Sequence, residues 1–270
     1  MGKEKKDQYV IACLDSESDA DAVLPMARHF AARLGKGLLV LNVSADGHNE
    51  WLQQYGLPYV GLRGDWKTAI DALPTAFGGV VAVTTVRDEA LRSSLTNPRT
   101  MLRTFADCKI AWLVTGEKHR QSADGQWPSE TWITLDHRRE SKEKLIWASY
   151  MVRFFGSSLT IATPAYSDAG FREKLRNNIL FATKMLRPLE VPFTTADMPS
   201  SNFRQPDMVL VGQHGKPDAA TGLLVAMTTD RRDRDLLDMV AGPTELRLLR
   251  QCPSPIMFVN HRDDIYVLCD

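Results

Sequence analysis

The residues best placed to do chemistry in this sequence are the glycines of Gly212-Gln213-His214-Gly215. They follow Asp207–Val211, a short apolar run that predicts a β-strand. Glycines at such a turn let backbone N–H groups approach an anion, so the pattern indicates a phosphate cradle. A strand-to-loop turn that holds no ligand is the alternative. A P-loop is excluded, because its spacing would require a glycine at Leu210 and a Ser or Thr at Pro217.

Two aspartates, Asp15 and Asp136, each end an apolar strand and precede an amphipathic helix. Either carboxylate can contact a ligand at the carboxyl edge of a parallel sheet, or cap the helix that follows it. His137 and His214 lie at the same predicted edge, although surface histidines are the simpler interpretation. The sequence contains no His/Cys cluster with metal-ligand spacing and no Gly-x-Ser-x-Gly elbow. We therefore predict no metal site and no catalytic residue.

Composition narrows the class of protein. The chain has 270 residues, of which 44% are hydrophobic and 24% charged, as in soluble globular proteins. Lys plus Arg equals Asp plus Glu, at 33 each, which gives no electrostatic footprint for nucleic acid or an anionic membrane. No apolar run approaches the ~18 residues needed to span a bilayer, and no secretory signal is recognisable. The four scattered cysteines favour reduced thiols and a cytoplasmic location.

The chain contains one strand–helix–strand unit twice. Asp15 stands twenty residues before Gly35, and Asp136 stands twenty residues before Gly156. With that offset, the apolar residues of the two intervening stretches coincide at helical spacing. Each glycine stands where a helix C-cap glycine belongs, and a further strand follows it. The repetition of strand, helix, cap and strand indicates two copies of one domain.

Strands alternate with helices through both copies, which predicts two tandem α/β domains, each with a five-stranded parallel sheet and right-handed crossovers. The predicted strands are 9–15, 37–43, 58–62, 79–83 and 110–114 in the first copy, and 131–136, 158–163, 191–195, 207–211 and 256–259 in the second. Long helices are predicted over 88–106 and 168–186. A polar segment with Gly125 and Pro128 separates the copies. We place the first domain at 1–118, the linker at 119–129 and the second domain at 130–270.

These motifs, together with the ending Cys252-Pro253-Ser254-Pro255-Ile256-Met257-Phe258-Val259, resemble the universal stress protein (UspA-like) family in a tandem form. The resemblance implies a Rossmann-like, adenine nucleotide alpha-hydrolase-like fold for each domain, with the two domains packed as a pseudo-dimer. It also implies a cytoplasmic stress-response protein with a binding or regulatory role. Its partners would be the chain itself, as a pseudo-dimer or homodimer, and an unidentified regulatory protein.

Nucleotide-binding members of that family carry an Asp after the first strand, a Gly-x-x-Gly turn and a later Gly-Ser/Thr. The resemblance implies a site for ATP or AMP with Mg²⁺ at the matching residues Asp136, Gly212, Gly215 and Gly242, together with Thr244, which adjoins the expected Ser or Thr position. Pro243 stands at the Ser or Thr position and lacks an N–H. We therefore expect nucleotide binding to be weak or lost. The alternative is an ATP-binding switch or slow ATPase built on the glycine loop of the second domain.

Residues 216–241 separate the two parts of that motif and are interpreted as an insertion in the second domain. The apolar run Leu223–Met227 is followed by Asp230 to Asp238, whose charges pair at i,i+4 and predict a solvated helix. A surface helix is one interpretation, and a lid or partner-docking segment is the other. A last apolar run, Ile265–Cys269, predicts an edge strand or a strand that crosses to the other domain. In the first copy, Thr84–Arg87 replaces the glycine turn.

Overall fold

The computed structural model describes residues 7–44, 49–106, 108–116, 127–138, 140–198, 206–214, 217–228 and 244–260. The chain divides into two compact units, Met1–His119 and Arg120–Asp270. Within these ranges, none of the helices combines the length and apolarity needed to cross a membrane. The same residues contain no group of His, Cys, Asp or Glu side chains arranged to hold a metal ion.

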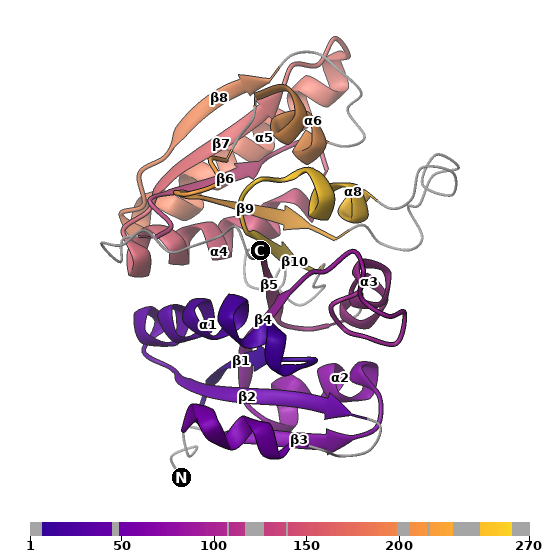
Figure 1. The fold of residues 1–270 in the computed structure, drawn as a ribbon. Helices are drawn as coiled ribbons and strands as arrows, with labels where there is room; N and C mark the ends of the chain where they lie inside the picture. Colours follow the sequence, from indigo (N-terminus) through magenta and orange to yellow (C-terminus); the bar gives the residue numbers. More distant parts are fainter. Residues whose placement is uncertain are drawn as a thin grey trace. The chain divides into compact units, whose positions relative to one another are not determined.

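The first unit is a five-stranded parallel sheet with the strand order β3-β2-β1-β4-β5 (Figure 1). Its strands are β1 (Tyr9–Cys13), β2 (Gly37–Ser44), β3 (Tyr59–Arg63), β4 (Gly79–Thr85) and β5 (Ala111–Thr115). Its helical segments are η1 (Glu17–Asp19), α1 (Ala20–Leu34), η2 (Glu50–Tyr55), α2 (Trp66–Ala76) and α3 (Pro98–Phe105). The five strands predicted for this copy are confirmed.

The second unit repeats this order as β8-β7-β6-β9-β10, again with parallel pairing. Its strands are β6 (Glu130–Thr134), β7 (Ser158–Pro164), β8 (Thr194–Met198), β9 (Gly222–Met227) and β10 (Ile256–Val259). Its helical segments are η3 (Glu140–Glu143), α4 (Lys144–Tyr150), the π-helical turn η4 (Met151–Phe155), α5 (Ala169–Leu186), η5 (Arg187–Leu189), α6 (Pro206–His214) and α8 (Thr244–Gln251). The prediction of two parallel α/β domains is confirmed.

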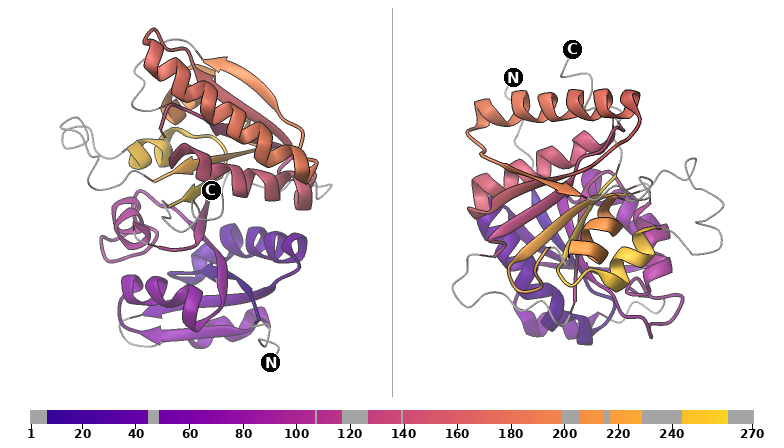
Figure 2. Two further views of the ribbon diagram at one scale, coloured as in Figure 1. Left: turned by 180° about the vertical axis from the view of Figure 1, so that it is seen from behind. Right: turned by 90° about the horizontal axis from the view of Figure 1, so that it is seen from above.

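Helices lie on both faces of each sheet. The chain adds strands first on one side of the first strand and then on the other, and right-handed crossovers therefore place the connecting helices on opposite faces. Figure 2 shows α4 and α5 on one face of the second unit's sheet, with α6 and α8 on the other. The predicted helix-ending glycines are also confirmed. Gly35 and Gly156 adopt left-handed φ angles of 61° and 73° at the ends of their helices.

The strand predicted at Asp207–Val211 is wrong, because these residues form most of helix α6. The fourth strand of the second unit is β9, which lies inside the segment interpreted as an insertion. It pairs with β6 on one side and β10 on the other, and Leu223 to Ala226 have no exposed surface. Short apolar runs have no periodicity that separates a buried strand from a buried helix. The segment interpreted as an insertion therefore contributes a central strand of the sheet.

Two further element boundaries differ from the predictions. The helix expected over 88–106 is limited to α3, because Asn97 caps its first N–H groups and Pro98 occupies the first turn. The residues before it form a loop of turns. Strand β8 begins three residues later than the predicted start of 191–195. Gly215, Gly242, the charged run Asp230 to Asp238, the run Ile265–Cys269 and most of the predicted linker lie outside the described residues.

Helix α6 generates a test of the corrected assignment. Gly212 lies inside the helix, and an added Cβ would meet nothing within 4 Å. Gly212→Ala should therefore stabilise the protein by about 0.5–1 kcal/mol in chemical denaturation, because glycine weakens a helix interior. Gly35→Ala is the matched control. Its Cβ also meets nothing, but its φ of 61° disfavours alanine, so this change should destabilise. Equal effects of the two changes would contradict the helical assignment.

Candidate functional site

The carboxyl edge of each sheet, beside the first strand, is the candidate site. The first strand of each unit, β1 or β6, lies at the centre of the order 3-2-1-4-5, where the direction of strand addition reverses. Open α/β sheets bind ligands at such a switch point, beyond the carboxyl ends of the strands. Asp15 and Asp136 lie directly beyond these two strands, as the repeat predicts.

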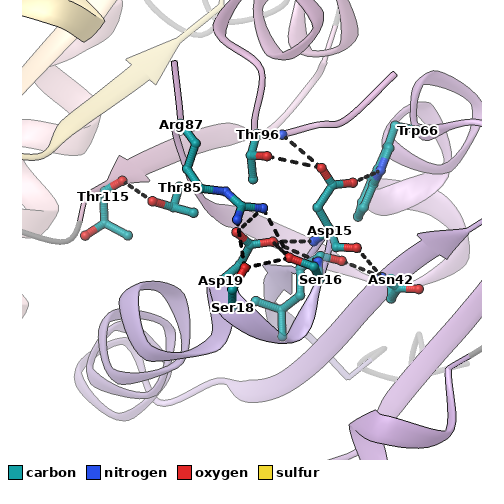
Figure 3. Close-up of polar contacts among 11 residues, drawn as sticks. Asp15, Ser16, Ser18, Asp19, Asn42, Trp66, Thr85, Arg87, Thr96 and Thr115 are labelled. Atoms are coloured by element: carbon teal, nitrogen blue, oxygen red, sulfur yellow. Dashed lines mark hydrogen bonds and ion pairs between the residues drawn. The ribbon is translucent and has the colours of Figure 1, made fainter. Parts of the chain in front are cut away.

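In the first unit, the Asp15 carboxylate is held by donors from two other elements (Figure 3). One oxygen, Oδ1, accepts a hydrogen bond from Trp66 Nε1 at 2.9 Å. The other, Oδ2, accepts from Thr96 N at 3.3 Å and from Thr96 Oγ1 at 3.2 Å. Trp66 is the first residue of α2, and Thr96 ends the loop between β4 and α3. Both oxygens at the predicted ligand-facing position are thus engaged by the protein itself.

Asp19, four residues beyond Asp15, forms a capping box with Ser16 at the start of η1. Its Oδ2 accepts from Asp15 N at 3.1 Å, Ser16 N at 2.8 Å and Ser16 Oγ at 3.1 Å. Arg87, just beyond β4, pairs with its Oδ1 at 3.0 Å and also donates to Ser18 Oγ. The Asp19 side chain has no exposed surface, and this burial raises its pKa, against the opposing effects of Ser16 and Arg87. Ser16 and Asp19 therefore take the capping role that the sequence offered to Asp15.

In the second unit, Asp136 is only 1% exposed and is held by Arg138. Its Oδ1 accepts from Arg138 N at 2.8 Å, and its Oδ2 accepts from Arg138 Nε at 2.7 Å, with Nη2 at 2.6 Å. Asn178 of α5 donates to the main-chain carbonyls of both residues. The backbone turn is thus fixed, and the carboxylate is neutralised by a guanidinium group two residues away.

A buried ion pair lies beside Asp136. Lys144 Nζ is 3.6 Å from Asp207 Oδ1 and donates to Thr134 Oγ1 at 2.8 Å, while the Thr134 hydroxyl donates to Asp207 at 2.5 Å. Burial lowers the pKa of Lys144, and the Asp207 carboxylate opposes that effect. The repeat aligns Lys144 with Val23, a fully buried apolar residue of the first unit. The two units therefore differ in chemistry at equivalent places in the fold.

An aromatic cluster completes the described part of this edge. His137 Nδ1 is 2.9 Å from the Tyr166 hydroxyl, and the His137 ring stacks on Phe171 with ring centres 4.2 Å apart. Burial, followed by the nearby Asp136 carboxylate, raises the pKa of Tyr166 to about 12. The phenol therefore remains protonated at neutral pH, and the direction of its hydrogen bond with His137 depends on the tautomer of the imidazole. The cluster packs the loops after β6 and β7 against the start of α5.

The structure does not gather the predicted nucleotide residues into one described site. Asp136 lies at the carboxyl edge, and Thr244 begins α8, the helix that leads back from the same edge. Gly212 lies near the C-terminal end of α6, which leads to the opposite, amino-terminal edge of the sheet. The C-terminal end of a helix presents carbonyl groups and partial negative charge, which disfavours phosphate. Gly215 and Gly242 are outside the described residues.

Sequence reasoning missed five residues that determine the chemistry of these edges. They are Trp66, Arg87, Arg138, Lys144 and Asp207. Because residues 207–211 were predicted to form a strand, Asp207 was not considered as a site residue. A helix prediction for this segment would have placed that aspartate in the first turn of the helix. Lys144 carried one usable signal, since it aligns with the apolar Val23 in the repeat. Trp66 and Arg87 carried none, because their partners are 51 and 69–71 residues away in sequence.

The geometry defines a class of protein with two tandem doubly wound α/β units, and solved structures share this fold. A universal stress protein from Archaeoglobus fulgidus matches with a TM-score of 0.64 at 12% identity, over 95% of this chain and 97% of the other. A Pseudomonas aeruginosa protein provisionally described as a universal stress protein matches with a TM-score of 0.59 at 13% identity, over 97% and 96%. The cytoplasmic domain of a prokaryotic cation chloride cotransporter matches with a TM-score of 0.52 at 14% identity, over 93% and 95%.

The chain therefore has the tandem fold of the universal stress proteins, as the resemblance implied. The sequence matches no protein-family model, and comparison with curated proteins finds no match. At these identities the structural likeness establishes the fold, and activity must be argued from the residues of the site.

The buried ion pair makes a strong prediction for stability. Lys144→Met should lower the free energy of unfolding by about 3 kcal/mol, because it leaves the Asp207 carboxylate buried without its cation. Adding Asp207→Asn should recover most of that loss. Lys174→Met, on the exposed side of α5, is the control and should change stability by less than about 0.5 kcal/mol. Chemical denaturation of the four proteins measures each effect, and a single Lys144 variant as stable as the control would contradict the prediction.

The lowered pKa of Lys144 also predicts a pH dependence. Between its folded-state pKa and its unfolded value of about 10.4, the unfolded chain keeps the proton that the folded chain has released. The free energy of unfolding of the wild type therefore rises with pH across that window, relative to Lys144→Met, which has no such group. Denaturation curves collected from neutral pH upward test this, and parallel pH profiles for the two proteins would refute it.

A double-mutant cycle tests the Trp66–Asp15 contact. Trp66→Phe removes the indole N–H, and Asp15→Asn removes the charge of the acceptor. The cycle should give a coupling energy of about 1–2 kcal/mol, in the range of hydrogen bonds to charged groups. The same cycle with Trp51→Phe, a tryptophan of η2, is the control and should give no coupling. Equal coupling for both tryptophans would show that the measured effect is not this hydrogen bond.

Proposed function

We propose that this protein is a cytoplasmic binding or regulatory module of the universal stress protein type, in which nucleotide binding is weak or lost. One observation carries the proposal. In both units, the aspartate at the switch point is already engaged by donors of the chain, Trp66 and Thr96 for Asp15 and Arg138 for Asp136. A nucleotide would have to displace these donors, and the lost hydrogen bonds would offset the binding energy gained.

The fourth strands add support. In nucleotide-binding members of the family, phosphate is held by glycines that follow the fourth strand. Here β4 is followed by Val86 and Arg87, and β9 is followed in sequence by Thr228-Thr229-Asp230-Arg231. Neither sequence contains the glycines that let backbone N–H groups approach an anion. The alternative function, an ATP-binding switch or slow ATPase, would have to use Gly215, Gly242 and Thr244 without Gly212 at the same edge.

The occurrence of this fold as one domain of a larger protein supports a function that depends on binding to partner proteins. One structural neighbour is the cytoplasmic domain of a cation chloride cotransporter, so this tandem fold also occurs as part of a larger protein. The surface of the second unit includes two exposed apolar side chains on α5, Phe171 and Leu180. We propose the chain itself, through pairing of its two domains or as a homodimer, and a regulatory protein as the partners.

Calorimetric titration of the full chain with ATP and Mg²⁺ tests the proposal. The expected result is no saturable heat at micromolar ligand, and no ATP or AMP released when the purified protein is denatured. Micromolar binding that Gly215→Val abolishes would overturn the proposal and support the ATP-binding alternative. Gly212→Ala is the matched control for that variant, because the alanine is accommodated within α6.

If binding is found, Asp15→Ala and Asp136→Ala locate it. Loss in only one variant assigns the nucleotide to that unit and overturns the proposal for that unit. Analytical ultracentrifugation of the full chain tests the self-association proposed here, with a strictly monomeric chain arguing against a homodimer.

A further inference from the structure

Three hydrogen-bond donors of the turn after β1 and the guanidinium of Arg87 converge on one buried carboxylate (Figure 3). Asp19 Oδ2 receives the N–H groups of Asp15 and Ser16 and the hydroxyl of Ser16, all within 3.1 Å. Arg87 Nη2 lies 3.0 Å from Asp19 Oδ1, and its guanidinium also donates to the hydroxyls of Ser16 at 3.1 Å and Ser18 at 2.7 Å. Backbone N–H groups, hydroxyls and a guanidinium are the donor set that proteins use for oxyanions.

Helix capping explains only part of this arrangement. A capping box accounts for the bonds between Ser16 and Asp19 at the start of η1. It does not account for Arg87, which reaches from the end of β4 to Asp19, Ser16 and Ser18. The Arg87 Nε–H is buried and makes no hydrogen bond to the residues that the structure describes. Buried donors are nearly always satisfied, so this group indicates capacity for one more acceptor oxygen.

Asp65 provides a comparison within the same unit. It caps α2 through a bond from Thr68 N at 3.0 Å and a bond from the Thr68 hydroxyl at 2.9 Å. Its carboxylate is exposed to solvent, with no arginine among these donors. The Asp19 side chain instead has no exposed surface, and it lies at the switch point, where open α/β sheets bind ligands. Solvent still reaches the donors around it, since the Arg87 side chain is 35% exposed and Ser18 is exposed.

We propose that the turn after β1, with Arg87, is an oxyanion-binding site whose occupant in the native chain is the carboxylate of Asp19. An external oxyanion of the phosphate or sulfate class binds there when that carboxylate is removed. In the native chain the Asp19 carboxylate thus occupies the anion site of the first unit. An external anion can bind only when this carboxylate is absent. The ligand is a free tetrahedral anion, so the inference is separate from the proposed loss of nucleotide binding.

The test is chemical rescue of the full-length chain with inorganic phosphate. Asp19→Ala should lower the Tm, and phosphate should raise it saturably, by about 4 °C at ten times the dissociation constant. Chloride at matched ionic strength corrects for general salt effects. The wild type should show only the general effect, because Asp19 occupies the donors. Adding Arg87→Met to Asp19→Ala should abolish the rescue.

Asp65→Ala is the control that separates capping from anion binding. It should lose stability without any rescue by phosphate. If Asp19→Ala does not fold, Asp19→Ser keeps a capping hydroxyl in a smaller side chain and is tested in the same way. The proposal is overturned if phosphate stabilises the Asp19 variants no more than the wild type. It is equally overturned if rescue persists without Arg87, or if Asp65→Ala is rescued to the same extent.

Discussion

Both halves of the chain depend on the position of the first strand at the centre of five parallel strands. Because the chain adds two strands on one side and then two on the other, the loops after the first and fourth strands meet at one edge. Residues separated by about seventy positions are thereby brought into contact, as with Ser18 and Arg87. In the second unit, Thr134 and Lys144, at and after the first strand, meet Asp207 at the start of α6, the helix that follows the third strand.

A carboxylate at this edge has lost much of its hydration and must be compensated by donors or a cation. The two units solve this problem with different residues. The first uses an indole and a threonine for Asp15, and an arginine from beyond β4 for Asp19. The second uses an arginine two residues away for Asp136 and a buried lysine for Asp207. In each unit the compensation comes from the chain, so these carboxylates do not depend on a bound ligand for their stability.

Local patterns in the sequence predicted what is locally determined. The helix between Asp15 and Gly35 ends where glycine alone adopts a left-handed φ without strain, and a fixed spacing reveals such a position. Strands β1 to β5 were predicted because short apolar runs alternate with helical segments along the first copy. The strand predicted at 207–211 failed because a short apolar run fits a buried helix and a buried strand equally well. Only the pairing of β9 with β6 and β10, a tertiary fact, distinguishes the two possibilities.

The candidate site was less predictable than the fold for the same reason. Asp15 and Asp136 were placed at the correct edge, since the end of an apolar strand is a local signal. Their partners were not found, because a hydrogen bond between Asp15 and Trp66 spans 51 residues and leaves no periodic trace. The first glycine of the motif was predicted to follow a strand, whereas Gly212 lies within helix α6. A motif of two glycines carries no information about which edge of a sheet it occupies. The element that precedes it decides whether its N–H groups are available to an anion or already used by a helix.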